Sequence, residues 1–191
     1  LVQPDALEIV QRISSIPGIQ EVSITTNAML LEKMAQPLAD AGLTRVNVSL
    51  DTLNPEKFLR ITRFGNIDQV WQGLQATQDA GLTPIKINTV VVRGVNDDEL
   101  VSLARLSIEN PWHIRFIELM PVSNQQSWGP SFPDKERYFS ISEMHERLAP
   151  LGLRPDSALV GNGPARTFRI PNALGTVGFI SPVGEHFCEN C

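Results

Sequence analysis

The sequence predicts an α/β fold in which βα units build a parallel sheet or barrel. Short runs typical of β-strands alternate with longer amphipathic segments along the chain. The segment Asp40-Ala41-Gly42-Leu43-Thr44 recurs as Asp79-Ala80-Gly81-Leu82-Thr83, each time at the end of a helical pattern and directly before a strand. In both copies the glycine stands where a helix ends in a left-handed residue, and the following leucine can pack back on the last turn. Because the connecting segments are helical and long, we expect parallel strand pairing.

The first half of the chain is predicted to alternate helices and strands. Helices are expected over residues 7–16, 29–41, 55–62 and 67–80, and strands over 21–26, 45–50 and 84–92. Pro17-Gly18 ends the first of these helices. Asn54-Pro55 supplies an N-cap and a proline at the first helical position of another.

The second half continues the alternation. Asn96-Asp97-Asp98-Glu99 resembles a capping box that opens a helix, and a strand is predicted over 113–119. Residues 121–139 carry Pro, Gly, Ser, Asn and Trp without periodicity, which predicts a long functional or mobile loop. Ser140-Ile141-Ser142-Glu143 opens a last helix with the same capping pattern, and strands near 166–170 and 176–181 are expected to form a hairpin.

Composition excludes several classes of protein. The chain has 191 residues, which fits one domain or one and a fraction, and no apolar run approaches the length of a membrane-spanning helix. Sixteen Lys and Arg against 21 Asp and Glu give a net charge of −5, which disfavours generic nucleic-acid binding. With two cysteines and no signal peptide in these residues, we expect a cytoplasmic protein. The chain opens without Met, and both ends are interpreted as cuts through a longer protein.

The predicted strands have one polar face each, although fully buried parallel strands are near-continuous apolar runs. Val46 and Val48, for example, share one face of their strand, and Ser49 lies on the other. A barrel with a polar interior would explain this pattern and implies a polar ligand, with Lys and Arg suited to phosphates or carboxylates. The alternative is an antiparallel sheet with one solvated face. The candidate interior residues are Thr25, Ser49, Lys86, Asn88 and Arg115.

Cys188 and Cys191 form a Cys-x-x-Cys pair at the end of the chain. Such a pair occurs in zinc sites, in redox dithiols and in iron–sulfur ligand sets, and two surface thiols without a metal are the plainest alternative. Spacing alone does not decide between them. A zinc or iron–sulfur site would need further ligands from outside these residues.

Several runs in chain order carry a resemblance to a known family. They are Ile24-Thr25-Thr26-Asn27, Val46-Asn47-Val48-Ser49-Leu50-Asp51, Ile85-Lys86-Ile87-Asn88-Thr89-Val90, Gly94-Val95-Asn96-Asp97, Arg115-Phe116-Ile117-Glu118-Leu119-Met120, Gly163-Pro164-Ala165 and Phe187-Cys188-x-x-Cys191. With them the chain resembles the molybdenum cofactor biosynthesis protein A family of GTP 3′,8-cyclases, which are radical S-adenosylmethionine (SAM) enzymes. The resemblance implies a partial (βα)₆ TIM-like radical SAM barrel over residues 1–120. It implies over residues 121–191 a C-terminal region leading to a second 4Fe–4S cluster.

The resemblance also implies a function and its residues. The family converts GTP, by a SAM-derived 5′-deoxyadenosyl radical, to (8S)-3′,8-cyclo-7,8-dihydroguanosine 5′-triphosphate, with two 4Fe–4S clusters in the full-length protein. Thr25, Lys86 and Arg115 match GTP-binding positions of the family. Ser49 and Met120 match SAM-binding positions, and Cys188 and Cys191 match two ligands of the second cluster. No residue is assigned as catalytic.

The resemblance further suggests partners and alternatives. A homodimer is possible, with GTP as substrate and the product passed to the cyclic pyranopterin monophosphate synthase step, and neither nucleic acid nor membrane is expected as a partner. The Cys-x₃-Cys-x₂-Cys motif of the first cluster is absent from these 191 residues, so we expect them to be inactive alone. The alternatives are another radical SAM enzyme with an auxiliary cluster, an inactive nucleotide-binding fragment, and an aldolase-like barrel using Lys86 as a Schiff base.

Overall fold

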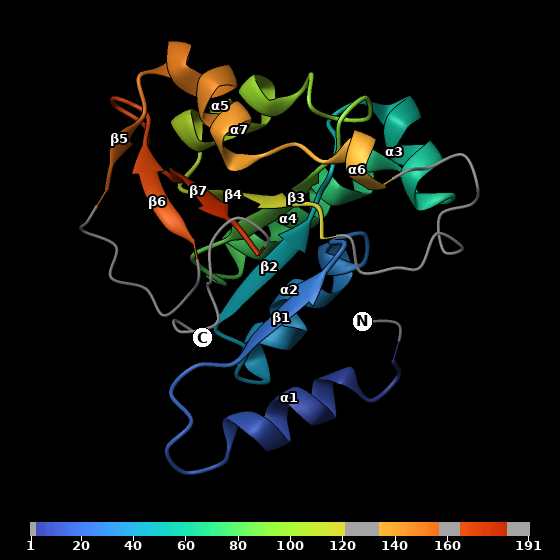
Figure 1. Cartoon of the computed structure of the whole chain (residues 1–191). Helices are drawn as coiled ribbons and strands as arrows, with labels where there is room; N and C mark the ends of the chain where they lie inside the picture. Colours follow the sequence, from blue (N-terminus) through green and yellow to red (C-terminus); the bar gives the residue numbers. More distant parts are fainter. Residues whose placement is uncertain (1–2, 121–133, 157–164, 183–191) are drawn as a thin grey trace. The chain divides into compact units, whose positions relative to one another are not determined.

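The computed structural model describes residues 3–120, 134–156 and 165–182. The chain divides into two compact units, residues 1–87 and residues 88–191 (Figure 1). Helices and strands alternate in the first unit, and the second combines helices with a mixed sheet, so the predicted α/β class is confirmed. No helix in the described ranges is long and apolar enough to cross a membrane.

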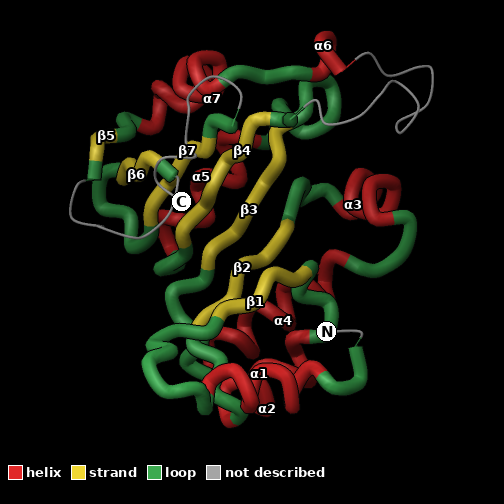
Figure 2. The backbone as a smooth tube through the Cα atoms, turned by 60° about the horizontal axis from the view of Figure 1, so that its bottom comes forward, coloured by secondary structure: helices red, strands yellow, loops and turns green. Residues whose placement is uncertain are grey.

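The first unit contains a parallel strand pair backed by helices. Strands β1 and β2 pair in parallel and lie side by side in Figure 2, with Thr25 opposite Asn47. Helices α2 and α4 pack against each other. The antiparallel alternative is therefore wrong for these two strands. The elements are α1 (Ala6–Ser14), β1 (Ser23–Thr26), α2 (Leu31–Asp40), β2 (Arg45–Ser49), α3 (Pro55–Thr62) and α4 (Ile67–Asp79).

The repeated Ala-Gly-Leu segments end α2 and α4 as predicted. Gly42 and Gly81 have φ angles of 97° and 71°, in the left-handed region. The backbone N–H of Leu43 donates to the carbonyl of Leu38 at 2.9 Å, which closes the C-terminal turn of α2. Leu82 makes the equivalent bond at the end of α4, and both leucines are buried. The motif therefore satisfies the last carbonyls and turns the chain toward the next strand.

The second unit adds a mixed sheet with strand order β3-β4-β7-β6-β5. Strand β7 pairs in parallel with β4 and antiparallel with β6, so the predicted hairpin is confirmed. Helix α5 packs on β4, on β7 and on α7. The elements are β3 (Lys86–Val91), which begins in the last residues of the first unit, α5 (Leu100–Glu109), β4 (His113–Glu118), α6 (Asp134–Arg137), α7 (Ile141–Leu148), a 3₁₀ turn (Ala149–Leu151), β5 (Arg154–Pro155), β6 (Arg166–Arg169) and β7 (Thr176–Ile180).

Two local predictions in the second unit are corrected. Helix α5 begins at Leu100 without a side-chain cap, because Asn96 is engaged elsewhere. The Asn96 amide donates to the carbonyl of Val90 and accepts from the N–H of Val92, so it fixes the turn after β3 instead of opening a helix. The predicted loop over 121–139 includes helix α6, and its residues 121–133 lie outside the described part of the chain.

Gly73 on α4 sets how closely the chain before α2 can approach. A Cβ atom at this position would lie 2.3 Å from the backbone oxygen of Ala28 and 3.2 Å from the Cβ of Leu31. Because a backbone oxygen cannot rotate away as a side chain does, we expect Gly73→Ala to lower the free energy of unfolding by about 1–3 kcal/mol. Denaturant unfolding measures this loss. The control Gln72→Ala, at the exposed neighbouring position, should stay within about 0.5 kcal/mol of the parent, and equal stability of the two variants would refute the contact.

Candidate functional site

The first unit presents its polar candidates on the face of β1 and β2 that is not buried. Thr25 is exposed in β1 and Ser49 is exposed at the end of β2. The alternate residues Val46 and Val48 are fully buried, so the predicted two-residue alternation is confirmed in β2. Hydroxyl groups on an accessible face can donate to or accept from a polar ligand.

Lys86 occupies the first position of β3 and is half-buried. Its neighbours Ile85 and Ile87 are 1% and 0% exposed, so Lys86 lies on the opposite face of the strand. An ammonium group on a long flexible stem can follow a phosphate chain as a point charge.

Arg115 and Asn88 form a pair between neighbouring strands of the second unit. The Arg115 Nε–H donates to the Asn88 Oδ1 at 2.8 Å, and both residues are half-buried. Since the guanidinium nitrogen can only donate, the amide must present its oxygen to it. A neutral acceptor of this kind orients the guanidinium without adding a negative charge at its Nε. The pair therefore suits recognition of an anionic group.

Met120 follows β4, and its side chain is 46% exposed. It lies past the carboxyl end of the strand, where α/β proteins commonly place ligand contacts. Its thioether offers a soft apolar surface to a flat or sulfur-containing ligand.

Glu118, which ends β4, is a buried polar residue that the predicted site omitted. It shares the buried face of the strand with Ile114 and Phe116 and is 2% exposed. Its Oε1 accepts from the Tyr138 hydroxyl at 2.7 Å and from the Ile141 N–H at 3.0 Å. A charged residue in phase with the apolar face of a strand was the signal in the sequence that could have found it.

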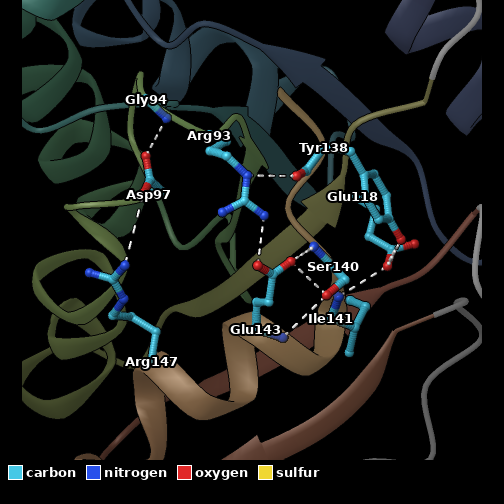
Figure 3. A network of polar contacts seen from close by, with 9 residues as sticks. All are labelled: Arg93, Gly94, Asp97, Glu118, Tyr138, Ser140, Ile141, Glu143 and Arg147. Atoms are coloured by element: carbon cyan, nitrogen blue, oxygen red, sulfur yellow. Dashed lines mark hydrogen bonds and ion pairs between the residues drawn. The ribbon is translucent and has the colours of Figure 1, made fainter. Parts of the chain in front are cut away.

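Arg93, which follows β3, contacts the segment 138–143 that leads into α7 (Figure 3). Its Nε–H donates to the carbonyl of Tyr138 at 3.1 Å, and its guanidinium lies 4.8 Å from the centre of the Phe139 ring. A further guanidinium nitrogen is 2.6 Å from the carboxylate of Glu143. Glu143 also accepts from the backbone and hydroxyl of Ser140, which completes the predicted capping box.

These contacts shift two pKa values. The hydrogen bond from Arg93, followed by the bonds from Ser140, lowers the pKa of Glu143 from 4.5 to about 2. Burial, followed by the hydrogen bond to Glu118, raises the pKa of Tyr138 from 10.0 to about 12. The Tyr138 hydroxyl therefore keeps its proton and remains a donor to Glu118 over the physiological range.

The described residues do not supply the ligands of an iron–sulfur cluster. Cys188 and Cys191 are the two cysteines of the chain, and both fall outside those residues. In residues 3–120, 134–156 and 165–182 no group of three or more His, Cys, Asp or Glu side chains could hold a metal ion. The donor set present there does not fit such a cluster.

Comparison with known proteins defines the class. A model of the radical SAM superfamily matches residues 1–107, and a model described as Molybdenum Cofactor Synthesis C matches residues 112–191. The chain belongs to the radical SAM superfamily, whose members generally use SAM and a 4Fe–4S cluster.

The chain is also similar over its whole length to individual curated proteins. Proteins named GTP 3′,8-cyclase from Pelotomaculum thermopropionicum and Moorella thermoacetica are each 47% identical to the chain. A protein of the same name from Heliobacterium modesticaldum is 46% identical. Each alignment covers 100% of this chain and 58% of the relative, so the chain spans a little over half the length of these relatives.

The lowered pKa of Glu143 predicts a pH dependence of stability. A carboxyl whose pKa is lower in the folded state stabilises the fold above its unfolded pKa and loses this contribution as the pH falls. For Glu143 the loss should run from about pH 4.5 to about pH 2. Because its side chain is 38% exposed and that of Arg93 is 42% exposed, screening should keep the contribution below about 1 kcal/mol.

Arg93→Gln should flatten this part of the curve of unfolding free energy against pH, since it removes the main cause of the shift. Thermal or denaturant unfolding between pH 2 and pH 7 measures the curve. Arg105→Gln, at an exposed position on α5, is the matched control and should keep the parent's profile. Identical profiles for both variants would show that Arg93 does not stabilise the Glu143 carboxylate.

Proposed function

We propose that the chain forms the central part of a GTP 3′,8-cyclase of molybdenum cofactor biosynthesis. The observation that carries the proposal is the similarity of the whole chain to relatives of that name, at 46–47% identity. The match to both a radical SAM model and a Molybdenum Cofactor Synthesis C model supports it, because the two together cover both units. The direct test is incubation of the complete protein with GTP, SAM and a reductant, followed by mass spectrometry for the cyclised nucleotide. GTP binding without product would favour a nucleotide-binding role instead.

The substrate GTP is proposed to contact Thr25, Lys86 and Arg115. The triphosphate calls for cations, and the guanidinium of Arg115 is oriented by its hydrogen bond to the neutral amide of Asn88. Lys86 lies on the face of β3 opposite two buried isoleucines, which suits a second phosphate contact. Thr25 adds a hydroxyl from the exposed face of β1.

The cofactor SAM is proposed to contact Ser49 and Met120. Both side chains are exposed at or beyond the carboxyl ends of strands, and a hydroxyl with a thioether suits the polar and apolar parts of SAM. Cys188 and Cys191 are proposed as two ligands of a second 4Fe–4S cluster, on their spacing and on the family resemblance.

The wider setting of the protein is also proposed. Residues 1–120 would belong to the radical SAM barrel, and residues 121–191 to the region of the second cluster. The complete protein would act in the cytoplasm, as a homodimer, and pass its product to the cyclic pyranopterin monophosphate synthase step. Neither nucleic acid nor a membrane is proposed as a partner.

Removing either cation should weaken binding of the triphosphate selectively. We expect Lys86→Ala and Arg115→Ala each to raise the Kd for GTP about tenfold, the effect of losing about 1.4 kcal/mol. The Kd for guanosine should change little, because guanosine carries no phosphate. Calorimetric titration of the complete protein with both ligands gives the comparison, with Arg105→Ala as the exposed control. An unchanged GTP affinity in both variants would show that Lys86 and Arg115 do not bind the triphosphate.

Asn88 offers a sharper test of how Arg115 works. In Asn88→Asp the acceptor keeps its place 2.8 Å from the Arg115 Nε but gains a negative charge. An ion pair would then compete with the triphosphate for the guanidinium, and we expect GTP affinity to fall about tenfold or more. Titration with GTP and guanosine measures the difference. A GTP affinity equal to that of the parent would mean that the charge of Arg115 does not act on the phosphates.

A further inference from the structure

Glu118 joins separate stretches of the second unit through its buried carboxylate. Oε1 accepts from the Tyr138 hydroxyl and the Ile141 N–H, at 2.7 Å and 3.0 Å. Oε2 accepts from the Ser181 hydroxyl at 2.7 Å. Tyr138 precedes α7, Ile141 is the first residue of α7, and Ser181 directly follows β7. One side chain at the end of β4 therefore fixes the start of a helix and the end of a neighbouring strand.

The chemistry of these contacts suits an anionic acceptor. All three partners donate, two of them to the same oxygen, which is the pattern expected around a carboxylate. Ile141 N–H also lies at the positive end of the α7 dipole. A carboxylate that is 2% exposed would be costly without such partners, so its position is retained only while the donors stay in place.

Arg93 adds a second point of attachment on the same segment. Its backbone N–H donates to the carbonyl of Arg137 at 2.9 Å, and its side chain reaches Tyr138, Phe139 and Glu143. Figure 3 shows the two groups approaching the segment from the ends of different strands, Arg93 after β3 and Glu118 at the end of β4. The segment 137–143 is thus held by a cation and an anion together.

This attachment acts on the end of β4 and not on its middle. Arg115 is held by backbone pairing beside Gly178 of β7 and by its bond to Asn88. Met120 lies beyond the last residues of β4 that pair with β7. Glu118, two residues before it, is buried and is held by the hydrogen bonds described above. Loss of the Glu118 contacts should therefore move the chain at Met120 more than the chain at Arg115.

We propose that Glu118 is a positioning residue for the carboxyl end of β4, which sets the path of the chain through Met120 and so the binding of SAM, while the triphosphate contact of Arg115 is independent of it. The inference rests on the proposed function, since it takes Met120 as a SAM contact and Arg115 as a GTP contact. A purely structural residue would affect both ligands or neither. The ratio of the two affinities is therefore the decisive measurement.

The test compares SAM and GTP binding in the complete protein by calorimetric titration. Glu118→Gln keeps the shape of the side chain but replaces an acceptor oxygen by a donor and removes the charge from all three contacts. We expect it to raise the Kd for SAM about tenfold and to leave the Kd for GTP within about twofold. Glu136→Gln, an exposed glutamate on α6, is the matched control and should change neither affinity.

Milder variants keep the test informative if Glu118→Gln folds poorly. Ser181→Ala and Tyr138→Phe each remove one donor, and each should weaken SAM binding about threefold with GTP binding retained. Equal weakening of both ligands, or no change in either, would overturn the positioning role while leaving the proposed function intact. A parent protein that bound neither SAM nor GTP would overturn the proposed function and this inference with it.

Discussion

The two-residue period of strand β4 is the constraint on which the second unit depends. Arg115 and Glu118 stand three positions apart, and this odd spacing places them on opposite faces of the strand. Arg115 lies on the half-buried face and meets Asn88, whereas Glu118 lies on the buried face and meets the start of α7. A shift of one residue in the pairing of β4 with β7 would exchange these faces. The register of one strand thus decides both the candidate ligand contact and the main buried polar contact.

The charged side chains of the second unit differ in the partners that they contact and in how deeply they are buried. Arg115 donates from its Nε to the neutral amide oxygen of Asn88, which orients the guanidinium. Glu118 accepts from two hydroxyl groups and a backbone N–H in a buried setting, where an unsatisfied carboxylate would be strongly unfavourable. Arg93 and Glu143 form a partly exposed ion pair, a kind of contact that adds little stability by itself. The buried carboxylate therefore constrains the structure, and the oriented guanidinium of Arg115 remains the candidate for ligand binding.

Local patterns predicted much of the fold because their physical causes are local. The caps at Asn54 and Ser140 and the left-handed glycines at the ends of α2 and α4 are as expected, since each depends on residues within one turn. Asn96 differs because its side chain finds partners across a turn, which the capping pattern does not encode. The parallel pairing of β7 with β4 was also missed, because it joins segments more than sixty residues apart in sequence.

In the candidate site, too, the sequence predicted local patterns but not contacts between residues distant in the chain. Alternation along single strands identified Thr25, Ser49, Lys86, Asn88 and Arg115 as polar positions, and their exposure or half-burial agrees with that pattern. Alternation did not identify Glu118, because a buried carboxylate is recognised by its partners, and those come from Tyr138 to Ser181. The roles assigned to these residues stay predictions until ligand binding is measured.

The run from Arg115 to Met120 places a candidate ligand contact, a buried carboxylate and an exposed methionine on one strand and its end. A residue in the middle of a strand is fixed by backbone pairing on both sides, so Arg115 needs only a side-chain partner to aim it. A residue past the end has no such pairing, and Met120 depends on whatever anchors the strand end. Glu118 supplies that anchor from the face turned away from Arg115, so the anchoring contacts do not compete with ligand for the same space. The arrangement therefore separates the oriented guanidinium, the buried carboxylate and the exposed methionine along one strand and its end.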